Sequence, residues 1–168
     1  MKIKIIRRNP VRSVIPGVLF QRAFSIFEFA IVLTIFALLV GIIGPAMLKM
    51  ADSAKADAAG SDIQEIADAI DDYFDENGEY PDSLADIFSP VPTDPWGNPY
   101  YYVKIQGAVP TPVGSLRKDK NLVPINSDYD LYSSGADGQT ANALTAAISK
   151  DDVVRGRDGN FFGYASDY

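Results

Sequence analysis

The stretch FSIFEFAIVLTIFALLVGIIGPAML, residues 24–48, decides how this chain is organised. Its part from Phe29 to Leu48 contains 20 consecutive residues without a charge. A helix of about 20 apolar residues crosses the roughly 30 Å hydrocarbon core of a bilayer. We therefore expect residues 24–48 to form a transmembrane helix. A secretory signal that is removed and a plain membrane anchor are competing interpretations of the same stretch.

Charge is distributed very unevenly on the two sides of this apolar stretch. Residues 1–23 contain six Lys and Arg and no acid, whereas the other nine Lys and Arg stand against all 22 Asp and Glu of the chain. Loops rich in Lys and Arg stay on the cytoplasmic side of a membrane. The sequence therefore predicts a basic cytoplasmic leader at 1–23 and an exported acidic region after the membrane helix.

Composition excludes several kinds of chemistry. The 168 residues include neither Cys nor His, which excludes a Cys/His zinc site, a Ser-His-Asp triad and a disulfide framework. No carboxylate pair stands out for acid–base catalysis, so we expect no enzyme. The basic cluster Arg117-Lys118-Lys120 lies in an acidic region and predicts no nucleic-acid partner. We interpret it as a contact for a neighbouring subunit's acidic face or as a solvated loop.

Glu28 places a carboxylate inside the apolar stretch. A charge at membrane depth costs about 2.5–3.5 kcal/mol on insertion scales and marks a functional candidate. One interpretation is that Glu28 lies close enough to the interface to reach water. The other is that cleavage between Ala23 and Phe24 creates an α-amine one helical turn away. The same amine on a neighbouring chain would then pair with Glu28 and favour assembly.

The string RAFSIFE, residues 22–28, followed by an apolar run, resembles the processing site of type IV prepilins and type II secretion pseudopilins. The resemblance implies cleavage after Ala23 by a prepilin peptidase in the inner membrane and methylation of the Phe24 amine. Glu28 then stands at the fifth position of the processed chain, where the family has Glu. Ala23 stands where the family usually has Gly.

Pro45 falls at the twenty-second position of the processed chain, where pilins often have proline. Proline removes one backbone hydrogen bond, and Gly41 and Gly44 weaken the same region. We expect a kink or a locally melted stretch between Gly41 and Pro45. A helix end at the membrane surface is the alternative.

The helix is expected to continue beyond the membrane as an amphipathic segment, residues 49–76. Apolar residues recur there at spacings of three and four, with acidic residues mostly on the other face. Asn77-Gly78 predicts the helix end, because both residues accept the left-handed backbone conformation. The apolar positions are Ile63, Ile66, Ile70, Tyr73 and Phe74.

Residues 77–168 are expected to form a small globular head rich in turns. A short helix is predicted within 82–88, strands at 100–103 and 129–133, a long loop at 105–126, one or two helical turns within 141–148, and a strand or hairpin within 153–163. The predicted fold class is α+β: a long N-terminal helix packed on a small antiparallel sheet with long loops, as in pilins.

Three motifs in the head make the resemblance to one group within this family more specific. Tyr80-Pro81, the run DPWGNPY at 94–100 and the run DLYSSGADG at 130–138 look like successive signatures of the major pseudopilin of type II secretion systems. The resemblance implies a structural subunit that forms a helical homo-oligomeric filament on the inner membrane and helps export folded proteins. Its implied partners are minor pseudopilins, the prepilin peptidase, a membrane platform and an ATPase. A minor type IV pilin and a membrane-tethered periplasmic binding module or enzyme stay open.

Calcium is the cofactor that the resemblance implies. On composition alone, an Asp beside Gly is more often a turn residue than a ligand. In the family, the loop after the second strand holds Ca²⁺ through a carbonyl, an Asp three residues later and further acidic residues. Transferred by position, these are the carbonyl of Ser134 and the side chains of Asp137, Asp151 and Asp152.

Overall fold

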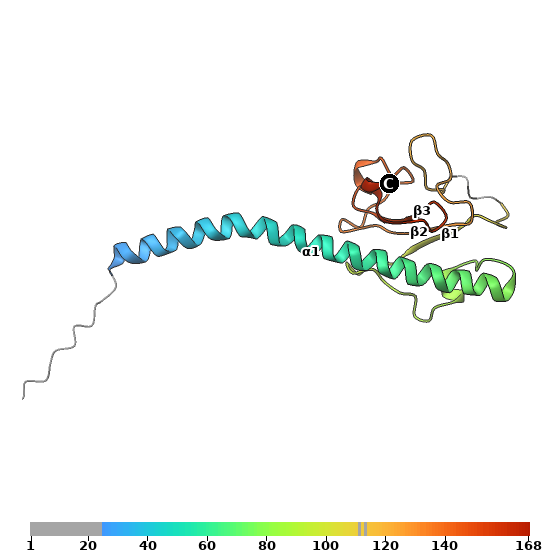
Figure 1. Cartoon of the computed structure of the whole chain (residues 1–168), viewed down its shortest axis with the longest axis horizontal. Coiled ribbons are helices and arrows are strands. Elements are labelled where there is room, and N and C mark those ends of the chain that lie inside the picture. Colours follow the sequence, from blue (N-terminus) through green and yellow to red (C-terminus); the bar gives the residue numbers. More distant parts are fainter. Residues whose placement is uncertain (1–24, 111, 113) are drawn as a thin grey trace, which may run out of the picture. The chain divides into compact units, whose positions relative to one another are not determined.

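The computed structural model describes residues 25–110, 112 and 114–168 (Figure 1). One long helix precedes four short strands and three 3₁₀ turns. Of the described residues, those from 25 to 42 and those from 43 onward form two separate units. In chain order the elements are α1 (Ile26–Asn77), η1 (Leu84–Asp86), β1 (Tyr101–Lys104), β2 (Tyr129–Ser133), η2 (Ala147–Ser149), β3 (Val153–Gly156), β4 (Phe161–Tyr164) and η3 (Ala165–Asp167).

Helix α1 ends where the sequence predicts. Gly78 follows the last helical residue with a φ of 76°, a backbone conformation that glycine adopts without steric cost. Its N–H donates to the Phe74 carbonyl at 2.7 Å, and the Asn77 side-chain amide donates to the Tyr73 carbonyl at 2.8 Å. The prediction of a helix end at Asn77-Gly78 is confirmed.

The region from Gly41 to Pro45 is helical throughout. The predicted melted stretch and the alternative of a helix end are therefore both absent from the described helix. A proline costs an α-helix one hydrogen bond without necessarily ending it, and long apolar runs with good helix propensity lie on both sides. A kink at this position stays a prediction.

The four strands form one antiparallel sheet in the order β1-β2-β3-β4. Tyr132 of β2 pairs with Tyr101 of β1 on one side and with Val154 of β3 on the other. Strands β3 and β4 form a hairpin in which Val154 pairs with Gly163. The predicted strands at 100–103 and 129–133 and the predicted C-terminal hairpin are confirmed, with shifts of a residue or two at the ends.

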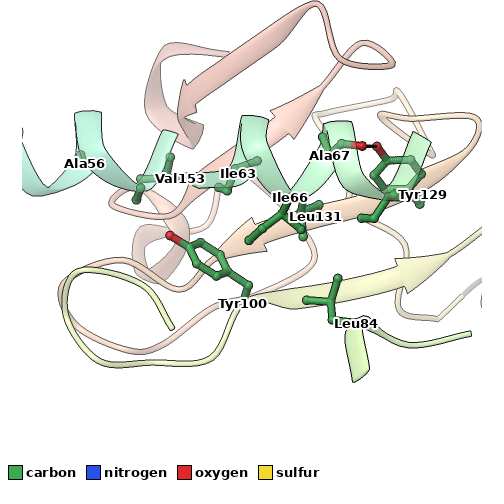
Figure 2. Packing of buried hydrophobic residues seen from close by; sticks show 11 residues of the cluster. Ala56, Ile63, Ile66, Ala67, Leu84, Tyr100, Tyr129, Leu131 and Val153 are labelled. Atoms are coloured by element: carbon green, nitrogen blue, oxygen red, sulfur yellow. Dashed lines mark hydrogen bonds between the residues drawn. The ribbon is translucent and has the colours of Figure 1, made fainter. Parts of the chain in front are cut away.

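The sheet is covered on both faces. On one face, Tyr129, Leu131 and Val153 pack against the C-terminal half of α1, as Figure 2 shows. On the other face, Tyr132 and Val154 pack under the loops that follow β1 and β2. The helix contributes the buried residues Ala56, Ala59, Ile63, Ile66, Ala67 and Ile70, and the loops and the last 3₁₀ turn contribute Ile125, Leu144 and Ala165.

Burial of apolar side chains between α1 and the sheet stabilises the head. Each fully buried large apolar side chain contributes about 1.5–3 kcal/mol relative to exposure. Of the five apolar residues predicted from their helical spacing, Ile63, Ile66 and Ile70 are each at most 3% exposed. The other two, Tyr73 and Phe74, are half-buried. The expected packing of an amphipathic helix on a small antiparallel sheet is therefore confirmed. In the segment 141–148, only Ala147 and Ile148 belong to a helical turn, the 3₁₀ turn η2.

Candidate assembly helix and candidate metal loop

The first half of α1 has no buried residue in the described chain. Every residue from Ser25 to Ile43 is exposed, and the helix is long and apolar enough to cross a membrane. Soluble proteins rarely leave an apolar surface of this size in water. Its large apolar side chains up to position 43 are Ile26, Phe27, Phe29, Ile31, Val32, Leu33, Ile35, Phe36, Leu38, Leu39, Val40, Ile42 and Ile43.

Glu28 lies in the first turn of α1 and is exposed. Ser25 caps this turn: its Oγ accepts from the Phe27 N–H at 3.3 Å, and its carbonyl accepts from the Phe29 N–H at 3.0 Å. A carboxylate in the first turn interacts favourably with the partial positive charge of a helix N-terminus. Among residues 25–110, 112 and 114–168, Glu28 belongs to no ion pair.

Ala23 and Phe24, the predicted cleavage and methylation residues, lie outside the described residues. Pro45 lies within α1. The cleavage site and the assembly role of Glu28 and Pro45 stay predictions.

The predicted metal loop folds back on Asp151. Gly135 has a φ of 67°, and a Cβ at this position would collide with the carbonyl oxygen of Asp151. The Asp137 N–H donates to Asp151 Oδ2 at 3.0 Å, while Asp137 Oδ1 accepts from the Gln139 N–H at 2.7 Å. The structure therefore brings Asp137 and Asp151 together, next to the buried Ser134.

Asp152 has a different set of contacts. It is fully buried, and its Oδ2 accepts from Arg117 Nη2 at 2.6 Å and from the Thr140 hydroxyl at 2.6 Å. Burial raises the pKa of this carboxyl, and the bonds from Thr140 and Arg117 oppose that rise. Asp152 is the acceptor of a buried ion pair with Arg117.

The four predicted calcium ligands do not fit the metal as a set. Ca²⁺ requires six to eight oxygens, and one carboxylate of the set, Asp152, is occupied by a guanidinium. Within the part of the chain that the structure describes, no three acidic side chains gather closely enough to hold a metal ion. Calcium binding through Asp137, Asp151 and the Ser134 carbonyl stays a prediction.

Two buried arginines were missed or misread from the sequence. The sequence predicts that Arg117 belongs to a subunit contact or a solvated loop, but it is only 1% exposed, whereas its neighbours Lys118 and Lys120 are exposed. Arg155 lies in β3, 3% exposed, and forms an ion pair with Asp128 at 2.6 Å. A charged residue within a β-branched run was the available signal for Arg155; nothing in the local sequence distinguishes Arg117 from Lys118.

Both buried guanidiniums lie over tyrosine rings of β2. Arg117 lies 4.2 Å from the ring centroid of Tyr132, and Arg155 lies 4.0 Å from that of Tyr129. Because Tyr129 and Tyr132 point to opposite faces of the sheet, each face holds one such pair. Cation–π contacts of this kind stabilise desolvated arginines by about 2 kcal/mol.

Comparison with known proteins gives a consistent result. A type II secretion system core protein G from Pseudomonas aeruginosa is 29% identical over 141 residues, which cover 71% of this chain and 86% of that protein. The protein of the same name from Vibrio cholerae is 25% identical over 147 residues, covering 76% and 88%. That from Xanthomonas campestris is 31% identical over 97 residues, covering 57% and 66%.

No family-level sequence profile matches the chain. No solved structure matches it significantly. The matched relatives nevertheless share one name across several bacteria, and the match covers most of their length. With its long apolar helix and antiparallel head, the chain is therefore similar to the major pseudopilin of type II secretion systems, core protein G.

Proposed function

We propose that this chain is a structural subunit of a type II secretion pseudopilus. The observation that supports the proposal most strongly is the first half of α1, which is apolar and exposed from Ser25 to Ile43 in the single chain. Lipid or the same helix of other copies must cover such a surface. The relatives are named as core proteins of a secretion system, which supports a structural role.

Anchoring in the inner membrane follows from the same helix together with the relatives' names. The basic leader at 1–23 favours a cytoplasmic N-terminus, because positively charged flanks stay inside. The head, residues 77–168, would then lie in the periplasm. After assembly it would lie in the pseudopilus.

Processing would precede assembly. A prepilin peptidase would cut after Ala23 and methylate the amine of Phe24. A subunit that leaves the lipid for the filament exchanges lipid contacts for contacts between helices, so little apolar burial is gained in that step. The pairing of Glu28 with the Phe24 amine of a neighbour would contribute favourably to the free energy of assembly and fix the axial register of the subunits.

Assembly requires work that this chain does not supply. An ATPase and an inner-membrane platform would provide it, and minor pseudopilins would join the filament. The resulting filament would help to move folded proteins out of the cell.

Mass spectrometry of the protein from its native membrane tests the processing step. The expected species begins at methylated Phe24, and recovery of the uncut chain alone would refute processing. Export of folded proteins, measured in a deletion strain, tests the role. The full chain should restore export, and the same head exported without residues 1–50 should not. Restored export by the free head would instead support a periplasmic binding module or enzyme.

A further inference from the structure

Arg117 occupies the centre of a buried polar cluster outside the assembly helix. Its guanidinium donates from Nη1 to the Thr140 hydroxyl at 2.6 Å and to the Ala141 carbonyl at 2.7 Å, and from Nη2 to Asp152 at 2.6 Å. The Thr140 hydroxyl in turn donates a hydrogen bond to the same Asp152 oxygen. One cation therefore contacts both ends of the segment 140–152.

The backbone around Arg117 reinforces these contacts. The Arg117 N–H donates to the buried Asp130 carboxylate at 2.7 Å. The next residue, Lys118, donates its N–H to the Asn142 carbonyl at 2.8 Å and accepts from the Leu144 N–H at 2.9 Å. The loop after β1 is thereby joined to β2 and to the segment after β2, next to the loop predicted to hold calcium.

Charge is balanced inside this cluster. Arg117 is 1% exposed and Asp152 is not exposed at all, and a carboxylate without a cation is strongly disfavoured at such a site. Arg117 also lies on the Tyr132 ring at 4.2 Å, which stabilises a desolvated guanidinium. The ion pair therefore supplies Asp152 with the positive charge that a metal ion would otherwise bring.

We propose that the Arg117 guanidinium is the cation around which residues 134–152 fold, so that the head of this protein is stable without a divalent metal ion. The proposal concerns the fold of the head and does not depend on the assembly function. Calcium is the competing occupant. Asp152 Oδ1 and Ser134 Oγ are buried without a hydrogen-bond partner in the described chain, and a bound ion would satisfy them.

Thermal unfolding of the full chain in detergent micelles distinguishes a head organised by Arg117 from a head that requires calcium. The head would be followed by near-UV circular dichroism, in EGTA and in millimolar CaCl₂. We expect the unfolding temperature to differ by less than about 2 °C between the two conditions, which is near the shift that a fraction of one kcal/mol produces. A rise of 5 °C or more with CaCl₂ in the wild-type protein would overturn the proposal.

The variant Arg117→Gln tests the arginine itself, with Arg155→Gln as the matched control. Arg155 forms the other buried Arg–Asp pair, and its side-chain bonds go to Asp128 and Tyr129 rather than to 134–152. Hydrogen exchange should become at least tenfold faster within 134–152 in Arg117→Gln and should stay near wild type there in Arg155→Gln. Equal exchange of this segment in both variants would refute the local role of Arg117.

A milder variant covers the case in which Arg117→Gln does not fold. Thr140→Val removes the hydroxyl that links Arg117 to Asp152 and leaves the direct ion pair in place. We expect faster exchange within 134–152 and no response to CaCl₂. Unchanged exchange, or recovery of protection on adding CaCl₂, would count against the guanidinium as the organising cation.

Discussion

The phenol of Tyr129 donates a hydrogen bond to the carboxylate of Asp71, with 3.2 Å between Tyr129 Oη and Asp71 Oδ1. The same oxygen lies 3.4 Å from the Ala67 carbonyl, a contact that Figure 2 shows as a dashed line. Tyr129 is fully buried in the second strand of the sheet. One side chain therefore joins β2 to the amphipathic half of α1, with the Arg155 guanidinium lying over its ring.

Replacement of Tyr129 by Phe should lower the free energy of unfolding by about 1 kcal/mol, because one buried hydrogen bond is lost while the apolar ring remains. Tyr101→Phe is the control, since the Tyr101 hydroxyl has no hydrogen bond in the described chain and the residue is 39% exposed. Urea unfolding of both variants measures the difference. Equal effects would contradict a specific role for the bond from Tyr129 to α1.

Gly135 should not tolerate a side chain. Its φ of 67° disfavours any other residue, and an added Cβ would collide with the Asp151 carbonyl. Gly78 is the matched control, because its φ is 76° but its Cβ position is open. We expect Gly78→Ala to cost about 1–2 kcal/mol from backbone strain alone and Gly135→Ala to cost clearly more. Similar urea midpoints for the two variants would show that the loop moves away from Asp151 without cost.

The regular parts of the fold were predictable because they follow from local periodicity. The spacing of Ile63, Ile66 and Ile70 indicates a helix face that must be buried, and Asn77-Gly78 indicates its end. Alternation at 129–133 is weaker, because both faces of β2 are buried, yet its two tyrosines, Tyr129 and Tyr132, still favour a strand. These features depend on residues close together in sequence.

The polar interior was not predictable in the same way. Arg117 and Asp152 are 35 positions apart, and their pairing depends on where the loop after β1 crosses the segment after β2. From the sequence around each residue, Arg117 is instead predicted to belong to a surface basic cluster and Asp152 to be a metal ligand. The composition of the chain does not reveal that Arg117 supplies the positive charge beside Asp152, because the two residues meet only in the tertiary structure.

Alkaline pH should destabilise the head. Burial is the main cause that raises the pKa of six tyrosines above the ordinary value of about 10: Tyr80, Tyr100, Tyr102, Tyr129, Tyr132 and Tyr164. The folded state then keeps phenol protons that the unfolded chain loses above about pH 10, so stability is complete below that pH and falls as the pH rises.

The variant Tyr100→Phe tests this linkage. It removes one titrating phenol, the one that donates to Asp62 at 2.9 Å. Between pH 10 and 11.5, the decline of the unfolding free energy should become shallower by up to about 1.4 kcal/mol per pH unit. Urea unfolding at a series of pH values measures the slope. An unchanged slope would mean that Tyr100 ionises in the folded head.

Glu28 provides the most direct test of assembly. Glu28→Gln should leave membrane insertion and the melting temperature of the head unchanged, because Glu28 belongs to no ion pair in the described chain. If the carboxylate pairs with a neighbour's Phe24 amine, filaments should be reduced at least tenfold in electron micrographs of overproducing cells. Thr34→Val is the matched control, since the Thr34 hydroxyl bonds within the helix to the Ala30 carbonyl at 2.8 Å. Its filaments should be normal. Normal filaments in Glu28→Gln would refute pairing with the amine and leave a position at the membrane interface as the account of this carboxylate.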